Sequence, residues 1–88
     1  MGLEHEVSSK RRSELDVIVD ILTITSKPAR RTKILYQANL SYRQMQRYLD
    51  LLVRTGLLAE HANPIRSYQV TEKGVEFLVT FRETRHTS

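Results

Sequence analysis

The sequence predicts a mainly α-helical domain that carries one small β-hairpin. Apolar residues recur at helical spacing in several segments, a pattern typical of helices that turn one side toward a core. Two short segments, 57–61 and 67–71, read instead as β-strands on either side of a turn that contains Pro64. The chain has 88 residues, which gives room for one domain with a modest core.

A first helix is predicted from about Ser13 to Thr25. Pro28 ends the helical pattern, because proline cannot continue the backbone hydrogen-bond ladder. This helix is apolar on two sides, so both sides must be covered. We expect its core side to consist of Leu15, Ile18, Val19 and Leu22. The opposite side consists of Val17, Ile21 and Ile24.

Two further helices follow in close succession. Residues 32–38 form the shorter one, after a segment at 29–31 that is either a short strand or the approach to this helix. The next helix has clear ends, because Ser41 is its N-cap, Gln44 is the reciprocal capping partner and Gly56 stops it. Its inner side should consist of Met45, Tyr48, Leu49 and Leu52. Its outer side carries three arginines and one acid, namely Arg43, Arg47, Arg54 and Asp50.

After the hairpin, Thr71 caps a last helix that we expect to end at about Arg82. This helix has two apolar stripes, one of Val75, Leu78 and Val79 and one of Phe77 and Phe81. We expect a single domain at residues 10–82, a flexible N-terminus at 1–9 and a flexible tail at 83–88. The predicted elements follow the order of a winged helix-turn-helix: helix, short segment, helix, helix, hairpin, helix. In this fold the third helix is the recognition helix.

The composition favours a polyanionic partner and offers little for catalysis. The net charge is +4, and cysteine is absent, so disulfides and thiolate sites are excluded. His5, His61 and His86 lack metal-ligand spacing, and we expect no metal and no cofactor. Asp16 and Asp20 lie one helical turn apart, but the sequence indicates no pocket for a catalytic pair, so we expect no enzyme and no small-molecule substrate. No apolar run is long enough for a membrane span, which favours a cytoplasmic, nucleoid-associated protein.

Several motifs resemble those of a known family. They are the run Ile34-Leu-Tyr-Gln-Ala-Asn-Leu-Ser-Tyr42, the later Tyr48-Leu49, Leu52 and Gly56-Leu57, and the segment Tyr68-x-Val-Thr-Glu-Lys-Gly74. Over roughly residues 11–81 the chain is similar to the small archaeal winged-helix DNA-binding proteins, which include predicted transcriptional regulators and a ten-kilodalton class of chromatin proteins. The resemblance implies a winged helix that binds double-stranded DNA without catalysis, commonly as a homodimer.

The resemblance also bears on how such a dimer would form. In the chromatin-protein members a long C-terminal helix makes an antiparallel coiled coil between subunits, whereas only residues 72–88 follow Thr71 here. We therefore expect the second apolar side of the first helix to pack against the stripe of Phe77 and Phe81 on the last helix. This packing occurs either within one chain or between two chains across a two-fold axis, and we favour the latter. The expected dimerisation residues are Val17, Ile21, Ile24, Phe77 and Phe81.

The expected DNA contacts fall into base-reading and backbone-binding groups. Arg43, Gln44 and Arg47 are the base-reading candidates, because arginine pairs with guanine and glutamine with adenine in the major groove. Gln46 lies at the margin of this face, and Tyr42 either contacts a phosphate or a thymine methyl or packs partly into the core. The residues expected on the phosphate backbone are Arg30, Arg31 and Lys33. Arg66, at the wing tip, is expected to reach a phosphate or the minor groove. Lys10, Arg11 and Arg12 either form an arm along the DNA backbone or are ordinary exposed cations.

The sequence thus predicts a double-stranded DNA-binding protein that acts as a transcriptional regulator or a chromatin protein. One alternative is a winged-helix protein-interaction module that does not touch DNA, although an arginine-rich outer face counts against a buried third helix. Another alternative is a single-strand or RNA binder, which usually displays stacking aromatic residues. We expect Tyr36, Tyr48 and Tyr68 to pack in the core, which counts against that alternative.

Overall fold

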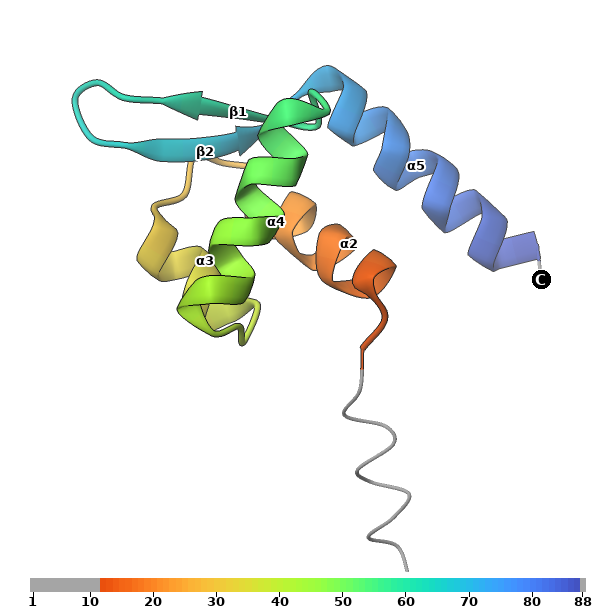
Figure 1. Cartoon of the computed structure of the whole chain (residues 1–88). Coiled ribbons are helices and arrows are strands. Elements are labelled where there is room, and N and C mark those ends of the chain that lie inside the picture. The colour runs from red at the N-terminus through yellow and green to blue at the C-terminus, as the bar shows by residue number, and fades with distance from the viewer. Residues whose placement is uncertain (1–11, 88) are drawn as a thin grey trace, which may run out of the picture.

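The computed structural model describes residues 12–87, and their side chains as far as residue 84. The predicted fold class is confirmed: helices and one antiparallel hairpin follow one another in the expected order (Figure 1). The elements are α2 (Glu14–Ile24), α3 (Arg31–Gln37), α4 (Tyr42–Arg54), β1 (Leu58–His61), β2 (Ser67–Val70) and α5 (Glu72–Thr87). The expectations for residues 1–9, Lys10 and Arg11 lie outside the described residues.

Helix α2 begins and ends as predicted but turns a different side to the core. Its N-cap is Ser13, which forms a capping box with Asp16, and its C-cap is Thr25. The buried apolar residues are Val17, Ile21 and Leu22, whereas Leu15 is exposed. The predicted core side was therefore only partly right: Leu22 is buried and Ile18 packs against the core, but Val17 and Ile21, which were expected on the opposite side, are buried as well. α2 packs against α3, β2 and α5 together, so the side that faces all of them is buried, and this side is centred on Ile21.

Helix α4 confirms the prediction made from its caps and its apolar spacing. Ser41 and Gln44 form both hydrogen bonds of a capping box, which satisfies backbone N–H groups at the start of the helix. Gly56 has a φ of 83°, the left-handed conformation that favours glycine after a helix. The buried residues are the predicted Met45, Tyr48, Leu49 and Leu52.

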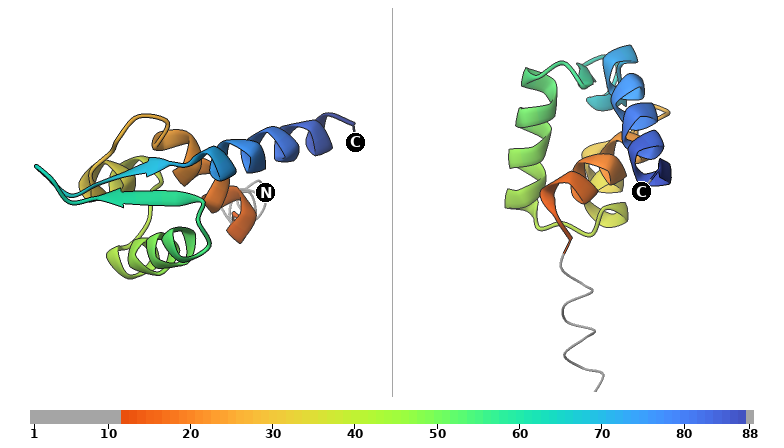
Figure 2. Two further views of the ribbon diagram at one scale, coloured as in Figure 1. Left: turned by 90° about the horizontal axis from the view of Figure 1, so that it is seen from above. Right: turned by 90° about the vertical axis from the view of Figure 1, so that its right-hand side faces the viewer.

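A third segment of the chain joins the hairpin along β2. β1 and β2 are antiparallel, with Leu58 opposite Val70 and His61 opposite Ser67. The segment expected to be a strand or a helix approach forms an isolated bridge, in which Ala29 and Tyr68 exchange two backbone hydrogen bonds of 2.9 and 2.8 Å. The hairpin loop extends to one side of the molecule, and α5 leaves on the other (Figures 1 and 2).

Helix α5 is longer than expected and packs on α2. It continues to Thr87, beyond the expected end at Arg82, because an established helix gains a backbone hydrogen bond with each added residue. Phe77 and Leu78 lie against the core, whereas Val75 and Val79 are exposed. The apolar stripe predicted from Val75, Leu78 and Val79 therefore does not form one buried side, because only Leu78 packs against the core.

Candidate nucleic-acid interface

The outer face of α4 is open and basic. Arg43, Arg47 and Arg54 are exposed on it, together with Asp50. The side chain of Arg47 is 62% exposed, and its nearest acid, Glu14, lies 3.8 Å away, at the edge of ion-pair distance. Among the described residues, no acid pairs with Arg43. The two main candidate arginines are thus neither covered by the chain nor neutralised by a close ion pair.

The two glutamines of α4 are less free than the arginines. The side-chain oxygen of Gln44 accepts a 3.0 Å hydrogen bond from the backbone N–H of Ser41, so it is occupied in the helix cap. A bidentate contact with adenine needs both the oxygen and the NH₂ group of the amide. Gln44 would therefore have to leave the cap in order to read a base in this way. Gln46 is half-buried, and its side-chain oxygen is buried without a hydrogen-bond partner.

Arg31 and Tyr42 form a unit between the starts of α3 and α4. The guanidinium of Arg31 donates a 3.1 Å hydrogen bond to the Tyr42 hydroxyl and lies 5.5 Å from the centroid of its ring. Tyr42 is exposed instead of packing partly into the core, and Arg30 and Lys33 are exposed beside it on or next to α3. The sequence identified Arg31 and Tyr42 one by one but gave no signal that they contact each other.

Another tyrosine, Tyr36, contradicts the expectation of core packing. Its side chain on α3 is 78% exposed, whereas Tyr48 and Tyr68 are buried as expected. The short α3 buries only Ile34 within its own length, and Ala38 is buried just after it, so the side that carries Tyr36 points outward. Aromatic surface is thus present near the basic residues, which the sequence did not predict.

At the wing, Arg66 is paired with an acid that sequence reasoning missed. Its Nε lies 2.8 Å from Oε2 of Glu60, and residues 62–66 of the turn are all exposed. Glu60 stands opposite Tyr68 in the strand register. Burial raises the pKa of the Tyr68 hydroxyl above 10.0, and the charge of Glu60 adds to this effect. The signal available in the sequence was the alternation of β1, which puts Glu60 and Leu58 on one side of the strand.

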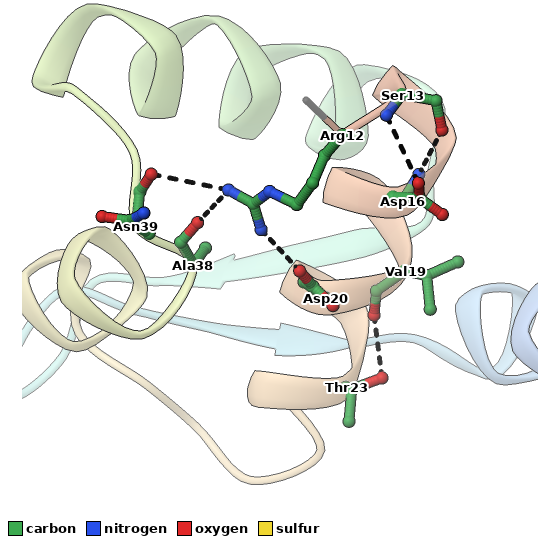
Figure 3. A network of polar contacts seen from close by, with 8 residues as sticks. All are labelled: Arg12, Ser13, Asp16, Val19, Asp20, Thr23, Ala38 and Asn39. Atoms are coloured by element: carbon green, nitrogen blue, oxygen red, sulfur yellow. Dashed lines mark hydrogen bonds and ion pairs between the residues drawn. The ribbon is translucent and has the colours of Figure 1, made fainter. Parts of the chain in front are cut away.

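Arg12 serves the fold, contrary to the expectation that it belongs to a DNA-binding arm. Its guanidinium pairs with Asp20 of α2 at 2.7 Å and donates hydrogen bonds to the backbone oxygens of Ala38 and Asn39 (Figure 3). Ala38 and Asn39 form the turn between α3 and α4, where Asn39 has a φ of 55°. Arg12 therefore connects α2 to the turn that precedes the candidate recognition helix.

The residues expected at a dimer interface are mostly used inside the chain. Val17 and Ile21 are buried in the core, with Ile21 0% exposed, so the expectation that they form a dimerisation surface is wrong. Ile24 and Phe77 pack against the same core, and Phe81 is half-buried. The physical reason is that α5 folds back onto α2 within one chain. The apolar residues left exposed on these two helices are Leu15, Val75 and Val79.

Metal-binding clusters, membrane-spanning helices and grooves are other features that could mark a functional site. Within the described residues, no group of His, Asp and Glu side chains is arranged to hold a metal ion. None of the described helices has the length and apolar character needed to cross a membrane. An open groove runs between α4 and the hairpin, and it is lined by Leu49, Asp50, Val53, Arg54, Glu60 and Tyr68.

With this geometry in place, the sequence comparison identifies the family. Residues 11–88 match the family model described as winged helix-turn-helix. The chain belongs to this winged helix-turn-helix family. This winged helix-turn-helix chain is also 32% identical over 65 residues to the uncharacterized protein MJ0287 of Methanocaldococcus jannaschii. The match covers 73% of this chain, which spans only 64% of the length of that relative.

Two solved structures resemble this winged helix-turn-helix protein. Sso10a-2 of Sulfolobus solfataricus, a DNA-binding protein, is 30% identical with a TM-score of 0.67, and the match covers 86% of this chain and 87% of that one. The resemblance to small archaeal winged-helix DNA-binding proteins is thus confirmed. A protein of unknown function from Listeria innocua has a TM-score of 0.69 at 17% identity, over 90% of this chain and 57% of that one, and shows the fold alone.

Proposed function

We propose that this winged helix-turn-helix protein binds double-stranded DNA with α4 in the major groove and the hairpin on the adjacent backbone. The observation that carries the proposal is the outer face of α4, where Arg43, Arg47 and Arg54 are exposed. Among the described residues, only Arg47 of these three has an acidic partner, Glu14, at 3.8 Å. An exposed, positively charged helix of this kind is how the fold presents base-reading side chains to a duplex. Sso10a-2, whose structure is similar, is itself a DNA-binding protein.

Each candidate residue has a distinct role in this proposal. Arg43 and Arg47 reach base edges, since they lie in the first turns of α4. Gln44 and Gln46 are secondary, because the amide oxygen of one is held in the helix cap and that of the other is buried. The phosphate contacts come from Tyr42 with Arg31 at the start of α4, from Arg30 and Lys33 near the start of α3, and from Arg66 in the wing.

The biological role is either transcriptional regulation or local DNA packaging in the nucleoid. Phosphate contacts set affinity and salt dependence, whereas contacts to base edges set sequence preference. Selection of bound duplexes from a random-sequence pool separates the two roles. Recovery of a motif supports a regulator, and recovery of no motif supports a chromatin protein.

Substitution of the α4 arginines tests the proposed interface. We expect Arg47→Ala and Arg43→Ala each to weaken duplex binding by about fivefold or more, because each removes a contact to a base edge or a phosphate. Fluorescence anisotropy with a labelled duplex at moderate salt measures the change. Arg82→Ala is the matched control, because Arg82 is an exposed arginine on α5, remote from α4.

The result that would overturn the proposal is equal binding by the parent protein and by both α4 variants. Competition with single-stranded oligonucleotides belongs to the same experiment, because Tyr36 and Tyr42 are exposed aromatic residues near basic ones. Stronger competition by single strands than by duplex would favour a single-strand binder. Weak binding to every nucleic acid, together with a copurifying protein, would favour a protein-interaction module.

A further inference from the structure

The hairpin turns one of its faces toward α4, and a single acid stands on that face. Leu58 and Tyr68 are buried on the inner side of the sheet. Glu60 lies two residues after Leu58 and opposite Tyr68 in the register, so it belongs to the same side. Its carboxylate lines the groove between the hairpin and α4, where Asp50 and Arg54 lie across from it. Glu60 is thus on the side of the hairpin that would approach DNA together with α4.

The ion pair between Glu60 and Arg66 cancels the charge of the wing. Residues 58–70 contain one acid, Glu60, and one arginine, Arg66, with no lysine. The distance from Arg66 Nε to Glu60 Oε2 is 2.8 Å, and the two side chains are 56% and 34% exposed. The hairpin therefore carries no net charge with His61 neutral, and while the pair is closed the charge of Arg66 is matched by an adjacent carboxylate. An uncharged wing attracts phosphate weakly.

The two partners are held unequally. Glu60 stands opposite the buried Tyr68 in the paired part of the hairpin, so the backbone that carries the acid is held near the groove. Arg66 is the last residue of the exposed turn before β2, and it is the more exposed partner. The guanidinium can therefore turn away from Glu60 while the carboxylate stays in place. A phosphate offers the same charge-assisted hydrogen bond that the carboxylate now accepts.

We propose that Glu60 is a built-in competitor of DNA phosphate for Arg66. The wing then contributes to binding only after a phosphate has replaced this carboxylate. Glu60 lowers the affinity for every duplex alike and leaves the choice of sequence to α4. This inference rests on the proposed function, because it assumes that the face of α4 and the wing meet DNA. It adds Glu60, an acid, to a site that had been defined only by its cations.

Replacement of the acid by its neutral amide tests the competition. Glu60→Gln keeps the size of the side chain but removes the charge that holds Arg66. We expect this variant to bind random-sequence duplex about three- to fivefold more tightly at low salt, which corresponds to the loss of one exposed ion pair. Glu76→Gln is the matched control, because it removes an exposed acid on α5, outside the groove and the outer face of α4, and none of the ion pairs among the described residues involves Glu76. Thermal unfolding of each variant establishes that it is folded.

A double-mutant cycle separates competition from a general effect of charge. In the Arg66→Gln background, the added Glu60→Gln substitution should improve binding no more than Glu76→Gln does. The inference is overturned when Glu60→Gln binds no more tightly than Glu76→Gln, or when its gain persists without Arg66. A purely structural ion pair would give unchanged or weaker binding in Glu60→Gln.

The failure of this inference is distinguishable from the failure of the proposed function. When Arg47→Ala weakens duplex binding and Glu60→Gln binds like the parent, DNA binding stands and only the competition is refuted. When the parent protein binds no duplex, or Arg47→Ala binds like the parent, the proposed function falls and the competition falls with it.

Discussion

Arg12 shows how one side chain fixes the position of a helix that it does not touch. The last carbonyl groups of a helix have no partner within the helix, and the guanidinium of Arg12 reaches the backbone oxygens of Ala38 and Asn39, just after α3. The same guanidinium pairs with Asp20 on α2. Arg12, which precedes α2 in the chain, thereby connects α2 to the turn that leads into α4 (Figure 3).

We expect Arg12→Ala to lower the free energy of unfolding by about 1–2 kcal/mol. This is less than the loss expected for a buried charged hydrogen bond, because the side chain of Arg12 is partly exposed to solvent. Arg12→Lys should recover only part of this loss, since an ammonium lacks the planar fork that serves several acceptors at once. Urea denaturation measures both variants. Equal stability of Arg12→Ala and the parent would show that the contacts of Arg12 do not hold the turn.

At the scale of elements, the contact between α5 and the hairpin depends on one glycine. A Cβ atom on Gly74 would lie 2.5 Å from the backbone oxygen of Leu57 and 2.5 Å from a methyl group of Val70. Both atoms belong to the root of the hairpin, so the first turn of α5 rests directly on it. This close approach explains why a residue with low helix propensity stands inside α5.

Gly74→Ala should destabilise the protein by roughly 1–3 kcal/mol, because overpacking outweighs the gain in helix propensity. Thr80→Ala is the control, since Thr80 is exposed further along α5 and alanine there should be neutral or slightly stabilising. Thermal unfolding followed by circular dichroism compares the two. A more stable Gly74→Ala variant would show that α5 does not approach the hairpin so closely.

Local signals in the sequence predicted the elements better than the sides they bury. The capping box of Ser41 and Gln44 determines the start of α4 within a few residues of chain, so it was predictable. The buried side of α2 depends on where α5 packs, and a helix that is apolar on two sides does not contain this information. For the same reason, the sequence identified Arg66 as a candidate residue but not its partner Glu60, which lies on another strand.

At the scale of the whole molecule, the exposed residues of α5 offer a surface for a second copy. Val75 and Val79 lie four residues apart on one side of the helix and are 46% and 47% exposed. They replace Val17 and Ile21 as the candidates for self-association, because those two residues are inside the core. We propose that these two valines contact a second copy of the chain, because a dimer is the form in which a helix-turn-helix protein reads two half-sites of DNA.

We expect the double variant Val75→Ser and Val79→Ser to shift the protein from dimer toward monomer, because serine removes apolar surface that the contact would bury. Analytical ultracentrifugation at several protein concentrations measures the shift. Glu72→Ser and Glu76→Ser on the same helix form the control pair, since they alter exposed polar positions. A parent protein that sediments as a monomer at every concentration would refute the dimer.

The bridge between Ala29 and Tyr68 has a consequence for the shape of the DNA that is bound. Two backbone hydrogen bonds tie β2 at Tyr68, one residue pair from the turn, to the segment before α3, so they oppose a hinge motion of the hairpin. The distance between α4 in the major groove and the hairpin loop on the adjacent DNA backbone is then nearly constant. The DNA must then adapt its shape to this fixed distance. We expect base-pair steps that bend easily, or that widen a groove easily, to be preferred even where no side chain reaches a base.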